Sequence, residues 1–213
     1  MIATEPFKWV RILRVGEEQD QAGRGEACRT GEVSGRNRDP MRIIHCTQKL
    51  LKELSVSLTD IPAIPSPMEG IGNWYSNLIR LDSKKCLLFT NEKSLYSFLI
   101  PAVVKTDLRI FPILFLTHLY LNLQYEDIPL DVIRQIQDEY KEISFAKTAS
   151  KHVLGAMNQL AFEYKVLIEM KEGLGNIEIL EMNRNINRTI MKGIKYQHPI
   201  EALRELLPTE AKE

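Results

Sequence analysis

The composition of the chain changes abruptly at Met41, and this change limits which part can form a folded core. Residues 1–40 contain six Arg and one Lys, whereas residues 41–213 contain seven Arg and fourteen Lys. Between Gly16 and Pro40 only four residues are apolar and five are Gly. Such a segment buries too little apolar surface to offset the entropy of ordering it. We therefore expect residues 1–40 to be a disordered leader, or upstream sequence from a misplaced start, and residues 41–213 to form one domain.

Charge and cysteine content narrow the class of protein. The chain has 28 basic and 28 acidic residues, a balance that gives no overall signal for nucleic acid or an anionic membrane, although a local basic patch is compatible with it. Three cysteines without a CxxC spacing argue against a disulfide framework, so we expect a reducing compartment, the cytoplasm. The most apolar stretch, residues 110–123, is shorter than the roughly 20 residues that span a bilayer. It predicts a buried core helix and no membrane partner.

Hydrophobic patterning predicts a small mixed sheet covered by helices. Residues 42–46 and 143–147 are predicted strands, and two apolar runs, residues 86–89 and 95–100, flank a short polar turn typical of an antiparallel hairpin. Helical spacing or caps predict helices near residues 47–54, 73–81, 110–123, 129–141, 150–171, 177–187 and 200–207. The fold class is α+β or mixed α/β, with three or four strands and about six helices.

A first candidate site lies where a predicted strand passes into a helix, at His45, Cys46 and Thr47. His45 is a candidate base and Cys46 a candidate thiolate nucleophile, and Thr47 can cap the helix with its hydroxyl. The alternative is a hydrogen-bonded structural histidine beside a small buried thiol. Adjacent strand residues point to opposite faces, which argues against joint action of His45 and Cys46.

A second junction, between a predicted strand and the long helix near residues 150–171, carries Lys147, Thr148 and Lys151. Free amides at a helix start, a hydroxyl and two lysines are suited to an anion. The alternative is an ordinary helix cap with solvated lysines.

A third candidate is the amide-rich segment at residues 183–189, which includes Arg184 and Arg188. Asn and Arg side chains suit the recognition of phosphate or of a base edge, and they equally serve as caps and turn formers. If this segment lies near Lys147 and Lys151, the chain has one basic face despite its zero net charge.

Motifs for catalysis, metals and nucleotides are missing from the sequence. No GxxxxGK[ST], GxGxxG, HExxH or GxSxG pattern occurs, and the four histidines are scattered. We therefore assign no catalytic residue, no metal site and no cofactor. The acidic pair Glu126 and Asp127 is interpreted as solvated surface.

Three stretches of the sequence resemble one known family. They are RIIHCTQKL at residues 42–50, CLLFTNEKSLYS at 86–97 and FAKTASKHVLGAMN at 145–158, with Trp74 after the first. Together they resemble an uncharacterised prokaryotic family, a domain of unknown function, over about residues 41–206. The resemblance implies a domain start near Met41 and no catalytic residues. Asn158, at the end of the third stretch, joins the candidate binding residues.

These observations leave three hypotheses for function. The leading one is a non-enzymatic cytoplasmic binding module that recognises a protein or nucleic-acid partner through residues 147–152 and the amide-rich segment. The second is a small enzyme with an anion-binding pocket at the two junctions, which parallel neighbouring strands would favour. The third is an antitoxin-like or oligomer-forming subunit. It requires a large exposed apolar patch, for which Trp74 and the hairpin edge are candidates.

Deletion of residues 1–40 tests the domain boundary. Because this segment offers little apolar surface to a core, we expect the melting temperature of the shortened chain to stay nearly unchanged in a thermal melt followed by circular dichroism. A fall of several degrees would show that the segment contributes to the folded domain.

Overall fold

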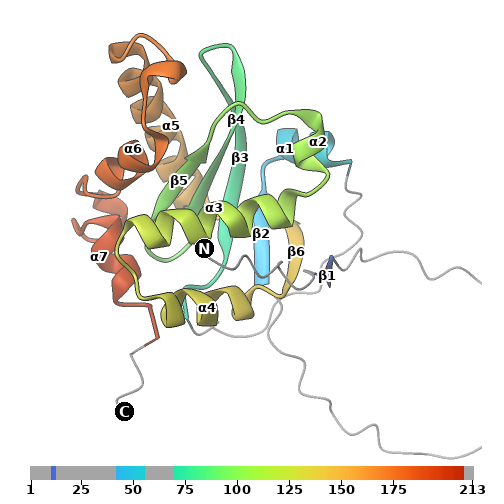
Figure 1. Ribbon diagram of the computed structural model, residues 1–213, viewed down its shortest axis with the longest axis vertical. Helices are drawn as coiled ribbons and strands as arrows, with labels where there is room; N and C mark the ends of the chain where they lie inside the picture. The colour runs from blue at the N-terminus through green and yellow to red at the C-terminus, as the bar shows by residue number, and fades with distance from the viewer. Residues whose placement is uncertain (1–10, 13–41, 56–69, 209–213) are drawn as a thin grey trace, which may run out of the picture.

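The computed structural model describes residues 11–12, 42–55 and 70–208, and these form a mixed six-stranded sheet with helices on both faces (Figure 1). The strands are β1 (Arg11–Ile12), β2 (Arg42–Cys46), β3 (Trp74–Leu81), β4 (Lys84–Asn91), β5 (Ser97–Ile100) and β6 (Glu142–Lys147). The α-helices are α1 (Gln48–Leu54), α2 (Lys105–Leu108), α3 (Phe111–Tyr125), α4 (Leu130–Glu139), α5 (Lys151–Met170), α6 (Ile179–Ile186) and α7 (Pro199–Arg204). The mixed α/β class expected from the sequence is confirmed.

The order of strands across the sheet is β1-β6-β2-β3-β4-β5. The first four run parallel to one another, and β3, β4 and β5 pair in antiparallel fashion. The predicted hairpin is therefore present as β4 and β5, and it extends one side of a parallel sheet.

The sheet separates two apolar cores. On one face Ile44, Trp74 and Phe89 pack against α1, α3 and α4, and Figure 1 shows α3 and α4 in front of the sheet. On the other face Tyr75 and Leu88 pack against α5 and α6. Strands covered on both faces lose the alternation of apolar and polar residues that marks a half-buried strand.

This burial explains the main error of the sequence-based prediction. Residues 73–81 were expected to form a helix, since Trp74, Leu78 and Leu81 are spaced for one helical stripe. They form β3, in which Trp74 and Leu78 face the first core and Leu81 faces the second. A central strand buried on both faces and an amphipathic helix produce similar spacings of apolar residues. The sequence-based prediction therefore took this strand for a helix. The expected three or four strands were accordingly too few.

Helix α3 is the predicted core helix, and only one of its faces is buried. It begins at Phe111 with Pro112 in the first turn, where the missing amide of proline costs nothing. Phe115 and Leu119 lie in the core, whereas Ile113 and Leu121 on the opposite side are exposed. The helix thus lies in the core as expected, but only along one face. Among the residues that the structure describes, no helix combines the length and apolar character needed to cross a bilayer.

The free edge of β5 is covered by Asn183 of α6 and by Asn187, which caps the end of that helix. The Ser97 amide donates to Asn187 Oδ1 at 2.8 Å, and Asn187 Nδ2 donates to the Ser97 carbonyl at 2.7 Å. One turn earlier, Asn183 Oδ1 accepts from the Leu99 amide at 3.0 Å. Asn183 and Asn187 are four residues apart, so they share one helix face and match alternate residues of the strand. The two amides thus replace part of a missing strand.

Replacement of Asn187 by Ala tests this edge. The change leaves the amide and carbonyl of Ser97 buried without these partners, at about 1–3 kcal/mol each. We expect the free energy of unfolding in urea to fall by about 2–4 kcal/mol. The matched control is Asn185→Ala, an exposed position on the same helix, for which we expect a change within about 0.5 kcal/mol. Equal effects of both changes would contradict the role of Asn187.

Candidate functional site

The two predicted strand-to-helix junctions lie side by side in the sheet. Strands β2 and β6 are parallel neighbours, aligned so that Cys46 is opposite Lys147. After β2 the chain enters α1, whose Leu50 packs in the first core, and after β6 it enters α5, whose Val153 packs in the second. Neighbouring parallel strands whose connections leave to opposite faces define a topological switch point. We refer to the residues at these two strand ends, 45–47 and 147–151, as the switch-point junction.

His45 holds the two strand ends together. Its Nδ1 donates to the carbonyl oxygen of Lys147 at 3.0 Å, because a carbonyl can only accept. The imidazole ring stacks on Tyr75, with ring centroids 4.6 Å apart. The hydrogen bond fixes the tautomer of the neutral ring, so that Nε2 carries the free lone pair. The His45 side chain is half-buried.

Tyr75 connects His45 with the start of α5. Its hydroxyl accepts from the Ser150 amide at 3.2 Å, and the Ser150 hydroxyl in turn accepts from the Val153 amide at 3.3 Å, which caps the helix. Burial raises the pKa of the Tyr75 phenol, and the nearby charge of Glu92 raises it further. Tyr75 is therefore neutral at physiological pH, with a proton of its own to donate.

Thr47 occupies the first position before α1, as expected, but its hydroxyl does not cap the helix. The Thr47 hydroxyl instead donates to Asn77 Oδ1 on β3 at 3.0 Å, and its amide donates to the Ser76 carbonyl at 3.0 Å. The chain therefore continues the β2–β3 ladder through Thr47 before it turns into the helix. The sequence-based prediction missed Tyr75 and Asn77 as members of this junction, since it placed both on a helix.

The remaining junction candidates come from β6 and α5. Lys147 ends β6 and Lys151 begins α5, and both side chains are exposed, with the half-buried Thr148 between them. Asn158 is exposed on α5, seven residues after Lys151 and so on the same side of the helix. Five of the predicted site residues thus lie at the carboxyl ends of β2 and β6 and at the start of α5: His45, Thr47, Lys147, Thr148 and Lys151. Asn158 lies two turns further along α5.

Arg184 and Arg188 are engaged elsewhere. Arg188 binds both carboxylate oxygens of Glu126, at 3.0 and 2.7 Å, and this bond raises the pKa of its guanidinium. Arg184 pairs with Asp127 at 3.3 Å and lies over the ring of Tyr125. Glu126 was interpreted as solvated surface, but it is 1% exposed. It is buried beneath the two arginines, and the role of Arg184 and Arg188 in this structure is to neutralise it.

Cys46 is a small buried side chain. It is fully buried in the first core, where its Sγ lies 3.6 Å from the Ile44 carbonyl. Burial raises the pKa of the Cys46 thiol far above its usual range. The thiolate is therefore not accessible at physiological pH, which favours the structural interpretation of Cys46 over the nucleophile.

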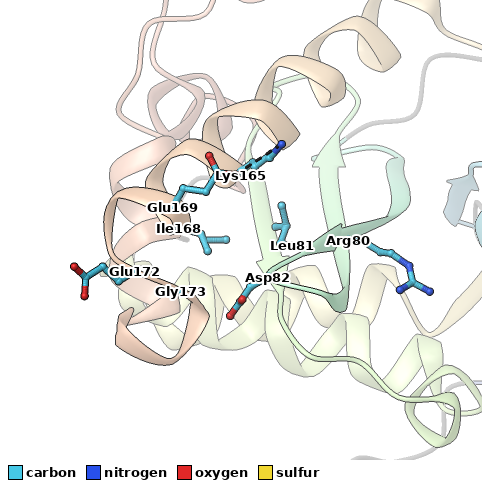
Figure 2. A pocket seen from close by; sticks show the side chains of 8 residues that line it. All are labelled: Arg80, Leu81, Asp82, Lys165, Ile168, Glu169, Glu172 and Gly173. Atoms are coloured by element: carbon cyan, nitrogen blue, oxygen red, sulfur yellow. Dashed lines mark ion pairs between the residues drawn. The ribbon is translucent and has the colours of Figure 1, made fainter.

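A cavity of about 340 Å³ lies far along α5 from the junction, between the C-terminal end of the helix and the turn after β3 (Figure 2). Its charged side chains do not converge: Lys165 pairs with Glu169, and Asp82 accepts from the Leu174 amide. Figure 2 shows Arg80 directed away from the other lining residues. Within the described ranges, no group of three or more His, Cys, Asp or Glu residues is placed to hold a metal ion.

Comparison with known proteins identifies the family. The sequence model of one protein family, a domain of unknown function (DUF6933), matches residues 43–202. The chain therefore belongs to this family. The family of unknown function expected from the sequence is therefore confirmed over nearly the same residues. No match was found among curated proteins or among solved structures.

The burial of Cys46 can be tested by thiol labelling. Because burial keeps the thiol protonated and out of reach, we expect Cys46 to stay unmodified by iodoacetamide in the native chain and to react once the chain is unfolded in guanidinium chloride. Peptide mass spectrometry distinguishes Cys46 from the other two cysteines. Rapid labelling of native Cys46 would contradict the burial described here.

Proposed function

We propose that the chain is a binding module for a small anionic ligand, which it holds at the switch-point junction. The observation that carries this proposal is that β2 and β6 are parallel neighbours whose helices leave to opposite faces. In open α/β sheets, ligands bind outside the carboxyl ends of strands at such a point, because the diverging connections leave the strand ends uncovered.

The charge of the junction supports an anion. Lys147 and Lys151 are exposed, and neither forms an ion pair with any residue in the part of the chain that the structure describes. The ammonium groups of lysine act as mobile point charges toward phosphate or carboxylate. Helix α5 has twenty residues and begins at Lys151, so the positive end of its dipole adds to the local potential. A local basic site of this kind is compatible with zero net charge.

A small ligand fits the junction better than a nucleic acid. Nucleic acids require a basic stripe that contacts several phosphates. The amide-rich segment would have extended the basic surface, but Asn183 and Asn187 are buried against β5, and Arg184 and Arg188 bind acidic residues. We propose a cytoplasmic location, in keeping with Cys46 and Cys86, which are free and buried.

A second function, catalysis of proton transfer on the bound anion, is favoured by one observation. The hydrogen bond from His45 Nδ1 to the Lys147 carbonyl leaves Nε2 as a proton acceptor at the switch-point junction, which also holds the two lysines. A histidine oriented through one nitrogen and open at the other is the usual arrangement of a general base. This alternative assigns the chemistry to His45 and the binding of the anion to Lys147 and Lys151.

The binding proposal is tested by titrating the full chain with inorganic phosphate and with pyrophosphate. We expect at least one of these anions to raise the melting temperature, since a ligand that binds only the native state stabilises it. The variants Lys147→Ala and Lys151→Ala each remove one charge from the junction, and we expect each to weaken binding about tenfold in isothermal calorimetry.

Lys165→Ala is the matched control, because Lys165 is exposed on the same helix at its far end. Its affinity should equal that of the wild type. Two results would contradict the proposal: neither anion binds, or Lys165→Ala weakens binding as much as the two junction variants do.

A further inference from the structure

The outer face of α3 carries an exposed apolar stripe. Its exposed members are Ile110, just before the helix, Ile113 in the first turn, and Leu121 and Tyr125 in the last turns. Leu114 and Tyr120 lie beside them, half-buried against the first core. Ile110 and Ile113 are 48% and 44% exposed, which is high for isoleucine. Figure 1 shows α3 crossing the front of the sheet, with no other described helix or strand in front of it.

The helix itself contributes no charged side chain to the stripe, although the guanidinium of Arg184 lies over the ring of Tyr125 at its end. From residue 110 to residue 125 the sequence has no Asp, Glu, Lys or Arg. The one titratable basic residue there is His118, and burial lowers the pKa of its imidazole, so that it is neutral at physiological pH. Apart from Thr117 and Gln124, the outer side of the helix is thus also apolar, although only the inner side faces the core of its own chain. A helix that is apolar all round is normally buried all round.

Charges flank the two ends of the stripe with opposite signs. Lys105 and Arg109 are exposed just before it, and Asp131 is exposed just after it, where Asp127 is also exposed but pairs with Arg184. If two copies of α3 lie antiparallel across a two-fold axis, the basic end of each faces the acidic end of the other. In a two-fold interface the same patch is used by both partners, so these two attractions occur together. A parallel arrangement would place like charges against each other at both ends.

We propose that α3 is the contact helix of a homodimer, in which the uncharged stripes of two copies pack antiparallel. An uncharged stripe meets its own copy without like-charge repulsion, and the opposite helix dipoles attract. A membrane surface is a poorer occupant, since anionic lipid attracts the basic end and repels the acidic end. This proposal is independent of the ligand-binding function, because α3 contributes no residue to the switch-point junction.

The size of the stripe sets the expected strength of the dimer. Fifteen helical residues are about 22 Å long, and one helix pair covers less than the roughly 800 Å² per partner of a typical stable interface. Exposed Val104 and Leu130, close to the two ends of α3 in sequence, extend the apolar surface. We therefore expect a reversible monomer–dimer equilibrium whose midpoint is reached at micromolar concentrations.

Sedimentation velocity of the full chain over a concentration series tests the proposal. We expect the wild type to dimerise and Ile113→Lys to raise the dissociation constant about tenfold or more, because the change buries one unpaired lysine charge of each copy in the apolar interface. The matched control is Ile190→Lys, at an isoleucine that is 55% exposed outside α3, and its dissociation constant should equal that of the wild type. Circular dichroism checks that both variants are folded.

A charge exchange tests the antiparallel arrangement. Arg109→Glu alone should weaken the dimer, since it places a carboxylate opposite Asp131, and the double variant Arg109→Glu with Asp131→Arg should restore it. A wild-type chain that stays monomeric at every concentration overturns the proposal, even if it binds vesicles. Dimerisation that Ile113→Lys leaves unchanged also overturns it, because the copies then meet at another surface.

Discussion

The fold depends on how the sheet ends at β5. An exposed strand edge presents unpaired amides and carbonyls, and it is a template for pairing with another chain. Here two asparagines of α6 supply donors and acceptors to Ser97 and Leu99, and Tyr164 and Asn122 hold Asn183 in turn through bonds of 2.8 Å each. Every member of this network is buried. A polar group without a hydrogen bond is most destabilising in such a low-dielectric interior, so each of these bonds matters for the stability of the fold. The network fixes α6 against the sheet and joins α3, α5 and α6 to a single edge.

In the same region, arginines are held by one buried acidic residue. Glu126 follows α3 and is buried, so it requires a positive partner, and Arg188 and Arg184 supply it from α6 while Arg204 donates to its carbonyl at 2.9 Å. These three arginines thereby link α6 and α7 to the end of α3. Lys147 at the end of β6 and Lys151 at the start of α5, by contrast, form no ion pair with any of the described residues. Their charge is the part of the junction that the proposed anion would contact.

Sequence reasoning predicted much of the fold and part of the site. Strand β2, the β4–β5 hairpin, β6 and the long helix α5 were predicted because their apolar residues follow a clear period and end at polar or capping residues such as Ser150. Strand β3 was not, since burial on both faces erased its alternation, and with it Tyr75 and Asn77 were missed. The amides of Asn183 and Asn187 were noticed, but their partner, the β5 edge, lies about 85–90 residues away in the sequence. No local pattern indicates which backbone such a side chain will meet. Trp74 and the hairpin edge, the candidates for an exposed apolar patch under the third hypothesis, are buried, whereas Ile113 and Leu121 of α3 are exposed.

Helix α3 has apolar residues on its buried inner face and on its exposed outer face, and the two sets have different causes. Its inner residues, Phe111, Phe115 and Leu119, form the aromatic and aliphatic centre of the first core, and that requirement fixes only half of the helix. Nothing in the packing of a single chain demands that Ile113 and Leu121 be apolar, and solvent favours charged residues at such positions. The sheet places this surface on the face of α1, whereas α5 begins on the opposite face, with the ends of β2 and β6 between them. The proposed association through α3 would therefore bury the stripe without using the residues of the switch-point junction, and the two surfaces can be changed separately by mutation.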